Sequence, residues 1–178
     1  PSRPGTLIAS NFNASYITYD EGKTWRPITF PNGIASSIIT SFEFHPNNDS
    51  IFWISISGFG TRKVFQTNNA GLTGNWIDIS GGMPPIPVNC LRYQPSSPDR
   101  LYAGTDLGVY YRDNGTRVWI PYNDGLPNTV VTDIDILKSS KKLRISTYGR
   151  GTWEADMVNC PELSCTVDIK GNVMFCSG

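Results

Sequence analysis

Few side chains in this sequence have the types and spacing that catalysis requires. The single histidine, His45, precedes a proline in a stretch typical of a turn, so it does not support a Ser-His-Asp arrangement. No phosphate-binding loop and no H-E-x-x-H motif occurs. On the loops where we expect a ligand to bind, the carboxylates are Asp106 and Asp124. Glycoside hydrolysis needs two carboxylates about 5–9.5 Å apart, and these two belong to a repeated pattern rather than departing from it. We therefore predict no catalytic residue.

The four cysteines do not have the spacing of a metal site. Cys90 stands alone in PVNCLRY, and we expect it to be a small buried apolar residue. Cys160, Cys165 and Cys176 crowd the last 19 residues with no histidine nearby, so we predict no zinc site. One disulfide among these three would fit an oxidising compartment and would leave an odd cysteine. No metal and no cofactor is predicted.

Composition excludes some classes of partner. The 178 residues include 15 basic and 15 acidic side chains, so the net charge gives no electrostatic case for binding nucleic acid or an anionic membrane surface. No apolar run approaches the roughly 18 residues of a membrane span, so no membrane insertion is expected. The 17 glycines, 13 prolines and 12% aromatic residues favour an all-β protein with many turns.

A turn motif recurs between the apolar segments. Its copies share Asp or Asn, then Gly, then Trp, and the first two copies also have threonines at alternate positions. The three copies are Thr18, Asp20, Gly22, Thr24 and Trp25; Thr67, Asn69, Gly71, Thr73 and Trp76; and Asp113, Gly115 and Trp119. The Asp/Asn positions are 49 and then 44 residues apart, and a second landmark, Phe44-His45-Pro46 against Tyr93-Gln94-Pro95, keeps the 49-residue step. Periods of this length built from short strands indicate propeller blades.

The fold class follows from the strands within each repeat. Residues 38–44, 51–56, 63–67 and 76–79 read as four strands, and the other repeats supply about ten more. We predict an all-β protein of four-stranded antiparallel propeller blades, about three and a half in number. Because propellers close with about 4–8 blades, we expect a partial propeller over residues 1–157. Residues 158–178 are predicted to be a linker and the beginning of another module.

The chemistry of the turn is structural. Asp20 can accept backbone N–H groups two residues on, and Gly22 supplies the positive φ of a tight hairpin. Thr18 and Thr24 can hydrogen-bond across the turn, and Trp25 can lay its ring under it. We therefore expect Asp20 and its counterparts Asn69 and Asp113 to stabilise the blades rather than bind metal.

The motif resembles the Asp-box, or BNR, repeat, Ser/Thr-x-Asp-x-Gly-x-Thr-Trp. Residues 18–25 match it at every position, and the other copies are degenerate. The repeat occurs in sialidases, sortilin-type receptors, xyloglucan-degrading glycosidases and a photosystem assembly factor. The segments LYAGTDLGVYYRDNG, NDGLPNTVVTDIDI and LRISTYGRGTWEADM resemble the last blades of sortilin-like propellers of secreted bacterial proteins. The resemblance implies fold more strongly than function, because the repeat serves hydrolases, receptors and assembly factors alike.

The tail CTVDIKGNVMFCSG has a different character. It resembles the first strands of Ig-like or PKD-like modules in large surface proteins of Bacteroidetes, which leave the cell through type IX secretion. The resemblance implies an extracellular or cell-surface location and a parent chain of several modules.

The resemblance also implies where a ligand would bind. In such propellers the Asp-box turns lie on one face, and ligands meet the opposite face, built from the loops between the second and third strands and between blades. Aromatic residues there can stack on sugars, and arginines can hold a carboxylate. The candidates on this face are Phe12, Phe59, Arg62, Asp106, Asp124, Tyr148 and Arg150.

The favoured interpretation is a non-catalytic propeller segment of a large secreted or surface-attached protein. It would bind a glycan or a protein, or act as a scaffold, and would pack against the remainder of its own propeller because unpaired edge strands seek partners. The alternative is the C-terminal part of a glycosidase of xyloglucanase or sialidase type, with catalytic residues in other blades. A third hypothesis is a structural repeat with no ligand of its own.

Overall fold

The computed structural model describes residues 2–11, 14–30, 33–34 and 38–158. Over these residues the chain forms fourteen strands in four antiparallel sheets, with no helix. No helix within the described ranges is therefore long and apolar enough to cross a membrane. The prediction of an all-β fold is confirmed.

The four sheets follow one another along the chain, and we call them blades 1 to 4. In each, every strand pairs with the next in sequence. Blade 1 holds β1 (Leu7–Ser10), β2 (Ser15–Thr18) and β3 (Arg26–Pro27). Blade 2 holds β4 (Ile39–Phe44), β5 (Phe52–Ile56), β6 (Val64–Thr67) and β7 (Trp76–Asp78). Blade 3 holds β8 (Val88–Tyr93), β9 (Leu101–Thr105), β10 (Gly108–Arg112) and β11 (Ile120–Pro121). Blade 4 holds β12 (Val131–Leu137), β13 (Lys142–Thr147) and β14 (Thr152–Asp156).

Each inner blade is apolar on both faces. Alternate side chains of a strand point to opposite sides of its sheet. All five residues of β5 are buried, so both sides of this sheet are covered. Phe52 and Ile54 pack against blade 1 in one cluster, and Trp53 packs against blade 3 in another. A third cluster, which includes Val109 and Ile145, joins blades 3 and 4. The core is thus three layers, each held between two neighbouring blades.

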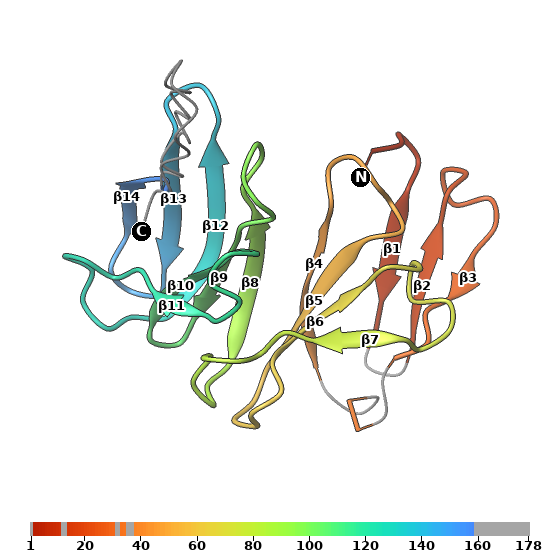
Figure 1. Cartoon of the computed structure of the whole chain (residues 1–178), viewed down its shortest axis with the longest axis horizontal. Helices are drawn as coiled ribbons and strands as arrows, with labels where there is room; N and C mark the ends of the chain where they lie inside the picture. The colour runs from red at the N-terminus through yellow and green to blue at the C-terminus, as the bar shows by residue number, and fades with distance from the viewer. Residues whose placement is uncertain (1, 12–13, 31–32, 35–37, 159–178) are drawn as a thin grey trace, which may run out of the picture.

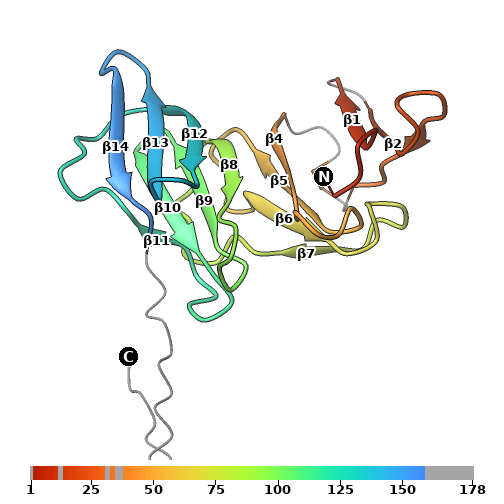
Figure 2. The ribbon, with the colours of Figure 1, turned by 90° about the horizontal axis from the view of Figure 1, so that it is seen from above.

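The blades are arranged as an open arc with β1 to β3 at one end and β14 at the other (Figures 1 and 2). The first strands of blades 2, 3 and 4, which are β4, β8 and β12, lie beside one another. This arrangement, in which successive sheets stack face to face around their innermost strands, is that of a β-propeller. Two blades of four strands and two of three strands agree with the prediction of about three and a half blades.

Two sequence-based predictions concern the outer strand of blade 1 and the C-terminal residues. The outer strand of blade 1 is limited to Arg26–Pro27, although residues 25–30 read as a strand. The Ile28 amide still donates to the carbonyl of Ser15 (2.8 Å), so hydrogen bonding to the β2 side continues one residue past Pro27. The predicted second module, residues 158–178, lies outside the described residues except for Val158, as do Cys160, Cys165, Cys176 and the candidate Phe12.

Candidate functional site

The repeated turns are closed by their own side chains. Asp20 accepts hydrogen bonds from the Thr24 amide (2.8 Å), the Thr24 hydroxyl (2.6 Å) and the Thr18 hydroxyl (2.7 Å). The hydrogen bonds from Thr24 and Thr18 lower the pKa of Asp20 to about 2. Gly22 has a φ of 89°, in the region that favours glycine. The Asp20 carboxylate is thus committed to its turn.

The other two turns vary this pattern. Asn69 accepts from the Thr67 hydroxyl (2.9 Å), and Gly71 has a φ of 69°. Asp113 accepts from the amides of Gly115 (3.0 Å) and Thr116 (2.8 Å), and its second oxygen binds the buried Arg100 guanidinium (2.7 Å). Gly115 does not take the positive φ in this third turn; Arg117 does, with a φ of 54°.

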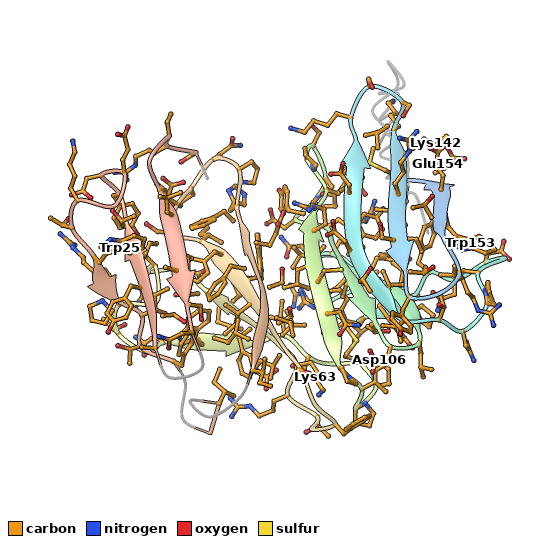
Figure 3. The ribbon with its side chains drawn as sticks, turned by 180° about the vertical axis from the view of Figure 1, so that it is seen from behind. Trp25, Lys63, Asp106, Lys142, Trp153 and Glu154 are labelled. Atoms are coloured by element: carbon orange, nitrogen blue, oxygen red, sulfur yellow. The ribbon has the colours of Figure 1, made fainter. Side chains whose placement is uncertain are left out.

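The tryptophans after these turns form two kinds of hydrogen bond. The indole N–H groups of Trp76 and Trp119 donate across to the preceding blade, to the carbonyls of Thr29 (2.7 Å) and Ile79 (2.8 Å). Trp25 lies at the end of the arc (Figure 3), is 41% exposed, and donates to the carbonyl of Gly22 in its own turn (3.0 Å). The first tryptophan supports a turn, and the other two join blades.

On the opposite side, the loop between β5 and β6 borders a cavity of about 360 Å³. The cavity is lined by residues 56–63 together with Gly33 and Ile34, which come from the connection between blades 1 and 2. Phe59 is 77% exposed beside it. This is the loop type on which the sequence analysis placed ligand binding, and the structure brings Phe59 and Arg62 together there.

Arg62 is held in place at this cavity. Its Nε donates to Asp78 (3.0 Å), and its guanidinium carbon lies 4.8 Å from the centre of the Phe65 ring. Burial acts to raise the pKa of Asp78, but hydrogen bonds from Ser80 and Arg62 hold that pKa below its ordinary value. A fixed guanidinium loses little side-chain entropy when it binds an acceptor.

Lys63 is a functional candidate that the sequence analysis missed. Its side chain is fully buried, and its ammonium donates to the carbonyl of Gly58 in the same loop. Burial lowers the pKa of Lys63, and the nearby Asp106 opposes this shift. Figure 3 shows Lys63 and Asp106 close together at this side of the molecule. Lys63 ties the loop that carries Phe59 to the body of the blade.

The remaining predicted site residues are spread out. Asp106 accepts from the side-chain Nδ2 of Asn89 (3.0 Å), whereas Asp124 borders a separate hollow beside β14. Tyr148 is 80% exposed and Arg150 is exposed, both on the loop between β13 and β14, and neither lines the cavity near Phe59. Among the described residues, no group of three or more His, Cys, Asp or Glu side chains could hold a metal ion.

A second polar cluster links the innermost strands. Arg92 on β8 contacts Glu43 on β4 (3.7 Å) and Asp133 on β12 (3.8 Å). Burial raises the pKa of Glu43, which also accepts from the Tyr93 amide (2.8 Å). Glu43 and Arg92 border a cavity of about 420 Å³ at the other end of these strands. Polar residues alternating with apolar ones in the first strand of each repeat were the signal that could have revealed this cluster.

Comparison with known proteins identifies the fold and does not identify an activity. No family model and no curated protein matches the sequence. The structure is similar to an ancestral GH74 enzyme, with a TM-score of 0.59 and 16% identity over 83% of this chain and 21% of that chain. It is similar to the GH74 enzyme of Niastella koreensis, with a TM-score of 0.57 and 17% identity over 80% and 24% of the two chains.

A structure of YCF48 bound to D1 peptide also matches, with a TM-score of 0.48 and 14% identity over 88% of this chain and 62% of that chain. The chain spans less than a quarter of the length of either GH74 enzyme. At identities of 16% and 17% these likenesses concern the fold. The chain is a set of β-propeller blades, part of a propeller in its architecture.

Proposed function

We propose that this chain is a non-catalytic part of a β-propeller that binds a glycan at the cavity beside Phe59. The observation that carries the proposal is an exposed aromatic ring and a fixed guanidinium on one loop, at a cavity of about 360 Å³. Ligand sites commonly have volumes of about 300–1,000 Å³ and combine aromatic side chains with a few placed polar groups. Phe59 would stack on a sugar ring, and Arg62 would donate to hydroxyl or carboxylate oxygens of the same glycan.

The wider context of this proposal rests on sequence. The agreement of residues 18–25 with the Asp-box motif supports membership in that group of propellers, with the C-terminal blades resembling sortilin-like proteins. On the same resemblance we place the protein outside the cell or at its surface, with the rest of a propeller as its structural partner.

The test is a binding assay on the full chain with a panel of neutral and acidic oligosaccharides, followed by titration calorimetry on those that bind. We expect Phe59→Ala to weaken binding about tenfold, since one aromatic contact contributes up to about 1.5 kcal/mol. Tyr148→Ala is the matched control, because it removes an equally exposed ring outside the cavity.

Two results would contradict the proposal: no binding by any sugar in the panel, or equal losses in the two variants. Cleavage of an oligosaccharide that is lost in Asp106→Asn or Asp124→Asn would instead support the glycosidase alternative.

A further inference from the structure

Blade 4 differs from blades 2 and 3 at its outer edge. Those blades have four strands, whereas blade 4 has three among the described residues. Its last strand, β14, pairs with β13 on one side and is exposed along its whole length. Figure 3 shows Trp153 and Glu154 at this end of the molecule. An edge strand presents backbone N–H and C=O groups on its open side. Of these groups in β14, the Asp156 carbonyl accepts from the Tyr122 hydroxyl (2.7 Å).

Blade 3 shows what fills the corresponding place between two blades. Trp119, at the start of the outer strand, is 3% exposed and donates to the carbonyl of Ile79. It belongs to the cluster between blades 2 and 3. Its neighbours there from blade 2 include Val64, Ile79 and Met83, and those from blade 3 include Leu101, Ala103 and Tyr110.

The corresponding residues between blades 3 and 4 border a hollow instead. Blade 3 and the segment after it supply Val109, Tyr122 and Leu126, and blade 4 supplies Leu143, Ile145, Trp153 and Ala155. The hollow has a volume of about 50 Å³, and Asp124 and Glu154 complete its lining. The hollow is continuous with the core between blades 3 and 4, because five of these residues, Val109, Tyr122, Leu126, Leu143 and Ile145, belong to that cluster.

Hydrogen bonds and strand register establish this correspondence. The Ile79 amide donates to the carbonyl of Val64 (3.0 Å), as the Tyr122 amide does to that of Val109 (2.8 Å). The Met83 amide donates to the carbonyl of Ser80, as the Leu126 amide does to that of Asn123, each at 2.9 Å. In blade 3, Leu101 pairs with Arg112 and Ala103 with Tyr110. In blade 4, Leu143 pairs with Ala155 and Ile145 with Trp153. Continuing the pairing of β10 with β11 sets Trp119 opposite Arg112, so the missing counterpart of Trp119 belongs opposite Ala155.

We propose that the edge of β14 and the adjacent hollow form a docking site for an extended peptide segment that carries a tryptophan. The segment adds a fourth antiparallel strand to blade 4, and its indole packs over the hollow opposite Ala155. Strand addition takes its affinity from backbone hydrogen bonds and its specificity from pockets for alternate side chains. The hollow supplies such a pocket next to an open edge.

The chain leaves β14 in a direction that does not supply this strand directly. The Met157 amide donates to the carbonyl of Lys141, and the Val158 amide donates to the hydroxyl of Tyr102 on blade 3 (2.8 Å). The strands β2, β6 and β10 are each followed by a turn and a tryptophan, but residues 154–178 contain no tryptophan. The proposed occupant is therefore a segment outside residues 154–178 with the chemistry of β11.

The test uses the full chain and a fluorescent peptide copied from residues 116–123, TRVWIPYN, which include β11 and Trp119. Binding is measured by fluorescence anisotropy up to millimolar protein concentration. We expect saturable binding, and at least tenfold weaker binding by the same peptide with alanine in place of its tryptophan.

Two variants locate the binding. Ala155→Glu puts a carboxylate into the hollow, and we expect it to weaken binding at least tenfold. Thr152→Glu adds the same charge to β14 on the opposite face, because Thr152 pairs with Ser146 and alternates with Trp153, and we expect no change. The proposal is overturned if the peptide does not bind, if the alanine peptide binds equally well, or if both glutamates weaken binding alike.

Discussion

Trp119 should be one of the most important side chains for stability, and Trp25 should not, although both follow a copy of the same turn. Trp119 is 3% exposed between two blades and donates to the carbonyl of Ile79 (2.8 Å). Truncating a large buried aromatic residue to alanine costs about 3–5 kcal/mol. Trp119→Phe keeps most of the apolar contact but leaves the buried carbonyl without its donor, at about 1–3 kcal/mol.

Trp25 provides the matched comparison. It is 41% exposed and bonds within its own turn, so only part of its apolar surface is removed from water. Because full burial of a large side chain contributes about 1.5–3 kcal/mol, we expect Trp25→Ala to cost about 1–2 kcal/mol. For a chain of this size, 1 kcal/mol corresponds to about 2–4 °C in Tm. Trp119→Ala should thus lower Tm by about 10 °C and Trp25→Ala by a few degrees.

The assay is urea unfolding of the full chain followed by far-UV circular dichroism, which does not depend on tryptophan emission. Thermal melts of the same variants check the order of the effects. If Trp25→Ala lowered the free energy of unfolding as much as Trp119→Ala does, with unchanged m-values, the assignment of Trp119 as the residue that joins blades 2 and 3 would be refuted.

Three further predictions concern single residues. Hydrogen bonds from Thr24 and Thr18 hold the pKa of Asp20 near 2, below the unfolded-state value of about 4. The stability that the Asp20 carboxylate contributes is therefore complete above about pH 4 and is lost as the pH falls from about 4 to 2. Unfolding curves measured across this range should show a smaller loss of stability for Asp20→Asn than for the unchanged protein. Burial raises the pKa of Cys90 to about 12, so this thiol should resist a thiol reagent at pH 8 in the native protein and react in urea, as read by mass spectrometry of its peptide; rapid native labelling would contradict its burial. Asp113→Ala removes the carboxylate that pairs with the buried Arg100 and should cost about 3–5 kcal/mol, whereas Glu154→Ala, which breaks an exposed pair with Arg144, should cost less than about 1 kcal/mol. Equal costs in urea unfolding would refute this difference.

The blade architecture could be predicted because its signals are local. An Asp or Asn followed by Gly and Trp recurs with nearly constant spacing, and the hydrogen bonds from Thr18 and Thr24 to Asp20 each span at most four residues. Alternating apolar residues mark the strands on either side. The limits of this reasoning appear at β3, which is limited to Arg26–Pro27, and in the third turn, where Arg117 rather than Gly115 takes the positive φ.

The candidate site could be predicted only in part. Loop position was sufficient to select Phe59 and Arg62, which share a cavity. It also selected Tyr148 and Arg150, which line none of it, because loops of one type look alike in sequence wherever their blade stands in the arc. Lys63 was missed since a lysine next to a glycine-rich loop gives no sign that its ammonium is buried against the carbonyl of Gly58.

The sequence by itself determined the strands, the turns that close them and the order of the blades, since each of these depends on residues close together in the chain. The tertiary structure alone decided what the blades do to one another. The bond from Trp119 to Ile79 spans 40 residues, and the one from Arg92 to Ile134 spans 42. The hollow beside β14 exists only because residues from two blades face each other across it. Such contacts depend on how sheets stack, and a repeat in sequence specifies each sheet more fully than it specifies the neighbour on which the sheet packs.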